Sequence, residues 1–245
     1  MSTICAISTA KGGAIGIIRT SGSDAISITD RIFRNPKGRT LAKAKPYSVV
    51  YGNIIDGVEI VDEVLVSVFR GPNSYTGEDS TEISCHGSSY ILNKVLELLI
   101  RHGCALARPG EFTQRAFING KMDLSQAEAV ADLIASQNKA THRIAMQQMR
   151  GGYSAKLQGL RNQLLEMTSL LELELDFSEE DVEFANREKL IQLAEDIKEE
   201  IQLLTESFRV GNAIKNGIPV AIIGAPNVGK STLLNALLNE DKAIV

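Results

Sequence analysis

The feature that most constrains this chain is a glycine-rich stretch that reads Gly-Ala-Pro-Asn-Val-Gly-Lys-Ser from Gly224 to Ser231. This is the spacing of a phosphate-binding loop, in which backbone amides between a strand and a helix point at phosphate oxygens. The apolar run from Ile218 to Ile223 predicts the strand, and residues Thr232 to Leu238 predict the helix. We therefore expect the first β-strand, phosphate loop and α-helix of an α/β GTPase-type domain in residues 218–245.

The residue types in this loop match the chemistry of a bound nucleotide. The Lys230 ammonium would neutralise charge on the β- and γ-phosphates, and the Ser231 hydroxyl would ligate Mg²⁺. Nucleotide binding is assigned to six consecutive residues: Asn227, Val228, Gly229, Lys230, Ser231 and Thr232. No switch segment or base-recognition motif follows the loop, and no Asp there is assigned to Mg²⁺. We expect no catalytic residue within this chain and expect those residues beyond Val245, so that this chain alone should not hydrolyse GTP.

The first 118 residues mix short β-branched runs with single helical segments, which predicts an α+β domain. The runs Ile15–Ile18, Tyr47–Ile55 and Val58–Phe69 predict strands, and Asp56-Gly57 between the last two predicts a tight hairpin. Apolar residues recur at helical spacing from Ser88 to Arg101, which predicts a helix with one buried face.

From Lys121 onward glycine and proline nearly vanish, and the period becomes helical. The segment Ser125-Gln-Ala-Glu128 predicts a capping box at a helix start. Two long amphipathic helices are predicted further on, with apolar stripes at Leu157–Leu171 and Leu190–Phe208. We expect them to pack antiparallel and to bury both stripes.

Local signals mark the ends of these long helices. The acidic segment Asp176–Asp181 is expected at the boundary between them, because carboxylates are favourable near a helix N-terminus. Gly211 and Gly217 are expected to break the second helix. The predicted domains are residues 1–118, 119–217 and 218–245.

Composition restricts the class of protein further. The three cysteines are an odd number at irregular spacing, which favours a reducing cytoplasm over a disulfide framework. No apolar run approaches the roughly 18 residues of a transmembrane helix, so no membrane association is predicted. The net charge of −4 argues against a general nucleic-acid binder. However, the segment Arg31–Lys45 holds six basic residues and no acid, so that it is either a solvated loop or a contact for RNA phosphates.

Three further stretches have to be explained together with the loop. They read Gly-Pro-Asn-Ser-Tyr-Thr-Gly-Glu-Asp at Gly71–Asp79, Ala-Arg-Pro-Gly-Glu-Phe-Thr-Gln-Arg-Ala at Ala107–Ala116, and Lys-Met-Asp-Leu-Ser-Gln-Ala-Glu-Ala at Lys121–Ala129. In this order, and followed by the phosphate loop, they resemble the MnmE (TrmE) tRNA-modification GTPases. The likeness runs from Ile4 to Val245.

The resemblance implies an N-terminal folate-binding domain that also dimerises, then a helical domain into which the GTPase domain is inserted. Carried over by motif, the folate contacts are Arg19, Glu82 and Lys121. A carboxylate is able to accept two parallel hydrogen bonds from a pterin edge, and basic side chains suit the carboxylates of the ligand's glutamate. The family also implies that Asn227 binds K⁺ between the phosphates.

The implied activity belongs to a larger assembly. Family members form a homodimer through the N-terminal domain and a heterotetramer with the FAD-dependent protein MnmG. With GTP, Mg²⁺ and K⁺, they install a carboxymethylaminomethyl-type group at carbon 5 of the tRNA wobble uridine. The one-carbon donor is a reduced folate, either 5,10-methylene- or 5-formyl-tetrahydrofolate. Two alternatives remain open, a ribosome-assembly GTPase that shares the loop and a folate-binding, self-associating scaffold without catalysis.

Overall fold

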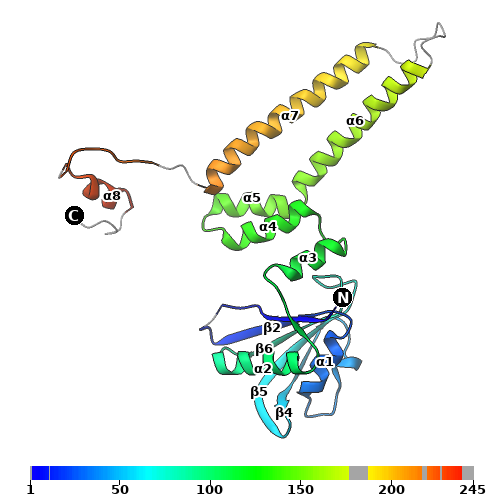
Figure 1. Ribbon diagram of the computed structural model, residues 1–245, viewed down its shortest axis with the longest axis vertical. Helices are drawn as coiled ribbons and strands as arrows, with labels where there is room; N and C mark the ends of the chain where they lie inside the picture. Colours follow the sequence, from blue (N-terminus) through cyan, green and yellow to red (C-terminus); the bar gives the residue numbers. More distant parts are fainter. Residues whose placement is uncertain (1, 11, 177–186, 217–219, 227, 239–245) are drawn as a thin grey trace. The chain divides into compact units, whose positions relative to one another are not determined.

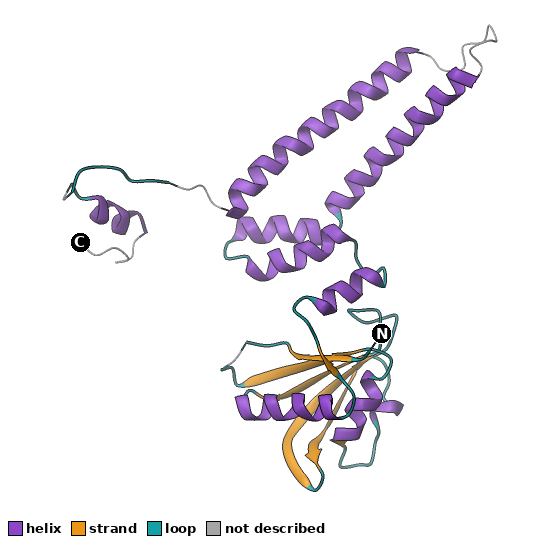
Figure 2. Cartoon of the chain, in the orientation of Figure 1, coloured by secondary structure: helices purple, strands orange, loops and turns teal. Residues whose placement is uncertain are grey.

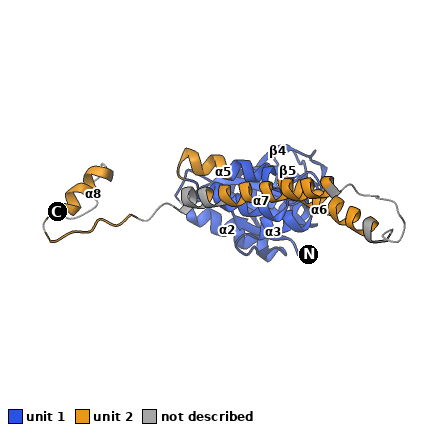
Figure 3. Ribbon diagram, turned by 90° about the horizontal axis from the view of Figure 1, so that it is seen from above, with its two compact units in different colours: residues 1–136, 145–155 blue, residues 137–144, 156–245 orange. Residues whose placement is uncertain are grey.

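The computed structural model of the protein describes residues 2–10, 12–176, 187–216, 220–226 and 228–238 (Figure 1). The chain divides into two compact units, one of residues 1–136 and 145–155 and one of residues 137–144 and 156–245 (Figure 3). The domain boundaries expected near residues 118 and 217 remain a prediction. Among the described residues, no helix is both long enough and apolar enough to cross a membrane.

The first unit is built on one seven-stranded sheet (Figure 2). The strand order is β3-β4-β5-β6-β2-β1-β7, and all neighbours are antiparallel except β1 and β7. The strands are β1 (Ile4–Ile7), β2 (Ile15–Ser21), β3 (Phe33–Arg34), β4 (Ser48–Asp56), β5 (Glu59–Phe69), β6 (Ser80–His86) and β7 (Ala105–Leu106). The three predicted strands are confirmed, and so is the hairpin, where Gly57 adopts a φ of 63°.

Helices α1 (Ala25–Ile32) and α2 (Ser89–Arg101) cover one face of this sheet. Because side chains alternate along a strand, every second residue of the central strands points at these helices and is buried. The largest fully buried side chains include Ile18, Ile83, Val64, Val66, Leu98 and Leu99. The predicted helix at Ser88–Arg101 is confirmed as α2.

Two further helices follow the sheet, α3 (Glu111–Ile118) and α4 (Leu124–Ala135). The predicted capping box is wrong in its residues, because Asp123 is the N-cap of α4. Its carboxylate accepts the amide of Gln126 at 2.8 Å, and the Gln126 side-chain oxygen accepts the amide of Asp123 at 2.9 Å. Ser125 lies in the first turn, where its hydroxyl accepts a hydrogen bond from Gln148. Two overlapping cap patterns compete here, and the stronger acceptor lies one residue before the helix.

Long helices then dominate the chain: α5 (Lys139–Met149), α6 (Gly152–Asp176) and α7 (Arg187–Asn216). The two predicted amphipathic helices are confirmed as α6 and α7. Full burial of their stripes is not observed, since among the stripe residues whose burial is described only Leu160 and Ile197 are buried, at 6% and 5% exposure. Leu164 and Ile201 remain 45% and 47% exposed, since two helices enclose only the side chains along one line of contact.

The predicted helix ends and the strand predicted before the phosphate loop are partly wrong and partly outside the described residues. Helix α7 continues through Gly211 to Asn216, because a single glycine weakens a helix by about 1 kcal/mol and does not end it. Gly217, residues 177–181 and residues 218–219 are outside the described part of the chain. Residues 220–223 form no paired strand, because the described chain offers this segment no neighbouring strand. The helix after the loop is confirmed as α8 (Lys230–Leu238).

Candidate functional site

Two of the three predicted folate contacts, Arg19 and Glu82, lie on the face of the sheet opposite α1 and α2. The two residues stand directly opposite each other on β2 and β6. Both Nε and Nη2 of Arg19 donate to Oε1 of Glu82, at 2.9 and 2.7 Å. Their side chains are 28% and 27% exposed, so a ligand arriving from solvent can reach both.

Two aromatic rings flank the Arg19 guanidinium. The rings of Tyr75 and Phe112 have their centroids 5.4 and 5.6 Å from it. At that distance the cation is attracted to the negative ring faces. The Tyr75 hydroxyl is hydrogen-bonded to Thr113 at 2.8 Å, which fixes one ring against α3. The result is a charged pair beside apolar ring surface.

Lys121 contacts the loop that carries one of these rings. Its Nζ donates to the carbonyl oxygen of Pro72 at 2.9 Å, and Asn119 donates to that of Thr76 at 2.7 Å. The chain segment after α3 is thus tied to the loop of residues 71–79, which carries Tyr75. The structure brings Arg19 and Glu82 into contact and places Lys121 against this shared loop. Among the described residues, the hydrogen bond of the Lys121 ammonium goes to the loop and not to the pair.

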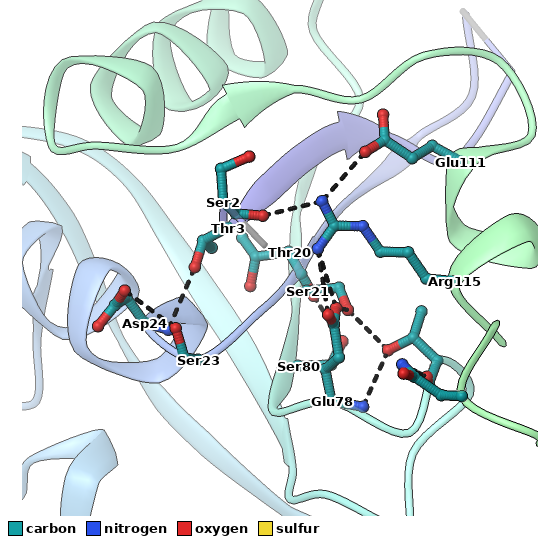
Figure 4. A network of polar contacts seen from close by, with 12 residues as sticks. Ser2, Thr3, Thr20, Ser21, Ser23, Asp24, Glu78, Ser80, Glu111 and Arg115 are labelled. Carbon is teal, nitrogen blue, oxygen red and sulfur yellow. Dashed lines mark hydrogen bonds and ion pairs between the residues drawn. The ribbon is translucent and has the colours of Figure 1, made fainter.

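A buried arginine holds these parts together (Figure 4). The Arg115 side chain, on α3, is only 4% exposed and donates to both oxygens of Glu78 at 3.2 and 3.1 Å. It also donates to Glu111 at 3.0 Å and to the carbonyl of Ser2 at 2.8 Å. Glu78 in turn accepts from the Ser21 hydroxyl at 2.7 Å. One cation therefore joins α3, the 71–79 loop, the end of β2 and the start of the chain.

This network has an electrostatic consequence. The backbone amide of Arg108 and the Arg115 guanidinium hold the pKa of Glu111 below its usual range. Sequence reasoning missed Arg115 and Glu78 as organisers and Tyr75 and Phe112 as ring partners. All four lie inside the motif stretches at 71–79 and 107–116, which is the one signal that could have found them.

The phosphate loop shows the local geometry that its sequence requires. Gly229 has a φ of 86°, a conformation that strains any residue with a Cβ, and α8 begins at the next residue. The Lys230 ammonium turns back onto the loop and donates to the carbonyl of Ala225 at 2.7 Å. A Cβ on Gly224 would lie 3.0 Å from Val228, so the loop closes tightly on itself.

The backbone amides at the start of α8 and the Lys230 ammonium are the groups of this loop that suit a phosphate. Ser231 and Thr232 occupy the first turn of α8, where free amides are available to an anion. Asn227, the expected K⁺ ligand, lies outside the described residues. Its assignment stays a prediction, as do those of the other loop residues.

Together, a polar site on the sheet of an α+β unit, long helices and a phosphate loop at a helix N-terminus place the chain in the class of P-loop proteins. Two family models match the chain, "GTP-binding protein TrmE N-terminus" at residues 3–121 and "MnmE helical domain" at residues 124–242. The chain belongs to the MnmE (TrmE) family, which confirms the resemblance and the expected fold class.

Curated relatives agree with this family. The chain is 68% identical over 244 residues to the tRNA modification GTPase MnmE of Bacteroides thetaiotaomicron, covering 99% of this chain and 52% of the relative. Proteins of the same name from Parabacteroides distasonis and Flavobacterium johnsoniae are 63% and 60% identical over 249 and 244 residues. These alignments cover 100% and 99% of this chain, and 54% and 52% of the relatives. The chain spans about half the length of the curated relatives it matches.

Proposed function

We propose that the full-length protein is a GTPase component of tRNA wobble-uridine modification that uses a reduced folate as one-carbon donor. The observation that carries the proposal is the Arg19–Glu82 pair, accessible beside two aromatic rings in a chain that also holds a phosphate loop. The names of the relatives support the tRNA-modification activity.

The site suits a flat heterocycle with a polar edge. Glu82 would accept paired N–H donors of a pterin, and the Tyr75 and Phe112 rings offer apolar surface beside it. Lys121 would neutralise a carboxylate of the folate glutamate, while Arg19, which is hydrogen-bonded to Glu82, would orient the Glu82 carboxylate at the pterin edge. The folate, as 5,10-methylene- or 5-formyl-tetrahydrofolate, would supply the one-carbon unit, while these residues bind and orient it.

At the phosphate loop, residues 228–232 would bind GTP. Their amides and the α8 N-terminus favour anionic oxygens, and the Lys230 head needs only to exchange the Ala225 carbonyl for a phosphate oxygen. Ser231 would hold Mg²⁺ and Asn227 would hold K⁺.

The proposed partners are a second copy of the chain, the FAD-dependent protein MnmG in a heterotetramer, and tRNA, in the cytoplasm. The face of the sheet opposite α1 and α2 supports self-association through the N-terminal domain. It exposes large apolar side chains on three strands: Ile15 at 65%, Val49 at 60% and Leu65 at 48%. Exposed large apolar side chains on one face of a sheet favour a surface that another protein covers.

The proposal is tested by tRNA analysis in cells that lack the protein. We expect the C5-aminomethyl-type wobble uridines to disappear from bulk tRNA, as measured by nucleoside mass spectrometry, and to be restored by the full-length protein. Variants Glu82→Gln and Lys230→Ala should fail to restore them, whereas Glu59→Gln, an exposed glutamate on the same sheet, should succeed. Unchanged tRNA in the cells without the protein would refute the proposal.

A further inference from the structure

A strongly cationic surface segment (the basic loop), which runs from the last turn of α1 through β3 to the chain before β4, lies outside the proposed folate and nucleotide sites. Residues 31–45 carry six basic side chains and no acid: Arg31, Arg34, Lys37, Arg39, Lys43 and Lys45. All six are exposed, and within the described part of the chain none of them forms an ion pair. The chain's net charge is −4, so the residues outside this loop together carry −10, which is −4 less the loop's +6. The positive charge is therefore concentrated and not neutralised by neighbours.

Hydrogen bonds hold the backbone of this loop in one conformation. The side-chain oxygen of Asn35 accepts the amides of Lys37 and Arg39 at 2.8 and 3.2 Å. The carboxylate of Asp30, the nearest acid before the loop, accepts the amide of Leu41 at 2.7 Å. The Leu41 side chain is fully buried and anchors the loop in the core. The cations therefore project from a fixed backbone, which lowers the entropic cost of binding a ligand.

Two hydrogen bonds connect the basic loop and the residues just after it to the loop of residues 71–79 and to Arg70, the residue just before that loop. Arg70 Nη2 donates to the carbonyl of Ala42 at 2.7 Å. The hydroxyl of Tyr47, two residues after the last lysine, donates to the carbonyl of Asn73 at 2.7 Å. The 71–79 loop carries Tyr75 and receives Lys121, so these hydrogen bonds connect the basic loop to the segment that carries one ring of the proposed folate site.

We propose that residues 31–45 form a docking surface for the phosphate backbone of RNA. Arginines and lysines without acidic partners on an ordered loop supply the contacts that phosphates require. Tyr47, 65% exposed and tied in place through its hydroxyl, offers a ring on which an unpaired base stacks. This inference rests on the proposed function, because it identifies the bound RNA as the tRNA substrate and places it next to the one-carbon donor.

The test measures binding of an unmodified, labelled tRNA transcript to the 245-residue chain across a series of KCl concentrations. The variant is Lys37→Gln, Arg39→Gln, Lys43→Gln, which replaces three exposed cations that form no ion pair with the described residues. Its matched control, Lys139→Gln, Lys156→Gln, Lys198→Gln, removes three exposed charges from the helices instead. Circular dichroism melting of both variants checks that the fold is retained.

We expect the loop variant to bind tRNA about 10- to 100-fold more weakly near 0.15 M salt. The slope of log K against log salt should become shallower by about 2 to 3, which is about 0.7–0.9 for each phosphate that the loop no longer neutralises. The control should keep the affinity and slope of the unaltered chain. Equally weakened binding in both variants, or unchanged binding in the loop variant, would overturn the inference.

Two further outcomes would also overturn it. One is loop-dependent binding to phosphatidylserine vesicles with unchanged tRNA binding, which would indicate a lipid surface. The other is that the unaltered chain binds no tRNA. In that case the proposed folate site is judged separately by folate titration, so failure of the RNA surface and failure of the proposed function are distinguishable.

Discussion

Replacing Arg115 should destabilise the first unit more than replacement of any neighbouring arginine. Its side chain is 4% exposed and donates to Glu78, Glu111 and the Ser2 carbonyl. Arg115→Met keeps the apolar stem and a good helix former. The substitution leaves the carboxylates of Glu78 and Glu111, which are 18% and 13% exposed, without their shared cation. Breaking a buried ion pair from one side costs about 3–5 kcal/mol.

The assay is urea unfolding followed by far-UV circular dichroism, because the chain contains no tryptophan. With an m value of about 2 kcal/mol/M, a destabilisation of about 4 kcal/mol lowers the unfolding midpoint by about 2 M. The matched control is Arg108→Met, which removes an arginine that pairs with the same Glu111 at 3.5 Å but is 75% exposed. That change should cost about 0–1 kcal/mol.

A double substitution separates the ion pair from the packing of the stem. The double variant Arg115→Met/Glu78→Gln removes the carboxylate charge that Arg115→Met alone leaves without its cation. Its destabilisation should therefore be smaller than the sum of the two single effects by about 1–3 kcal/mol. Strict additivity, or an Arg115→Met variant as stable as Arg108→Met, would show that this network does not hold the unit together.

Local geometry supports three other predictions. Asp123→Ala should lower stability by about 1 kcal/mol in urea unfolding because it removes the α4 cap, whereas Ser125→Ala should change it by less than about half of that. The pKa of Glu111 is depressed in the folded state, so its ionisation contributes fully to stability above the ordinary value of 4.5. This contribution disappears as the pH falls through the lower pKa of the folded state. Glu111→Gln should therefore reduce the loss of stability at acid pH, as measured by urea unfolding at a series of pH values. Burial raises the pKa of the Cys85 thiol to about 11, so this cysteine should resist iodoacetamide at pH ~8 until urea unfolds the chain, as read by peptide mass spectrometry.

The elements that sequence reasoning predicted well are those with a strong local signal. Helices α2, α6 and α7 have apolar residues at helical spacing, and the β4–β5 hairpin has Asp-Gly at its turn. The phosphate loop was recognisable because its glycines and lysine are fixed by backbone geometry. In each case the residues that decide the structure lie within one element.

The parts that it could not predict depend on contacts between distant residues. The pairing of β2 with β6 joins Arg19 to Glu82, 63 positions further along the chain, and only this pairing sets the two side chains opposite each other. Arg115 reads as an ordinary helix-surface arginine, since nothing nearby in the sequence shows that Glu78 and Ser2 will surround it. The cap of α4 was mispredicted for another reason, because two cap patterns start two residues apart, at Asp123 and Ser125, and both fit the local sequence.

A calorimetric titration of 5-formyltetrahydrofolate into this chain decides whether the Arg19–Glu82 pair is a folate site. Unaltered protein and Glu59→Gln should bind saturably with a Kd below about 1 mM, which corresponds to about −4 kcal/mol. Glu82→Gln should show no saturable heat, because its amide replaces one acceptor oxygen with a donor against the pterin edge. Binding that is equally strong in Glu82→Gln, or absent from the folded unaltered chain, would contradict the assignment of this pair to folate.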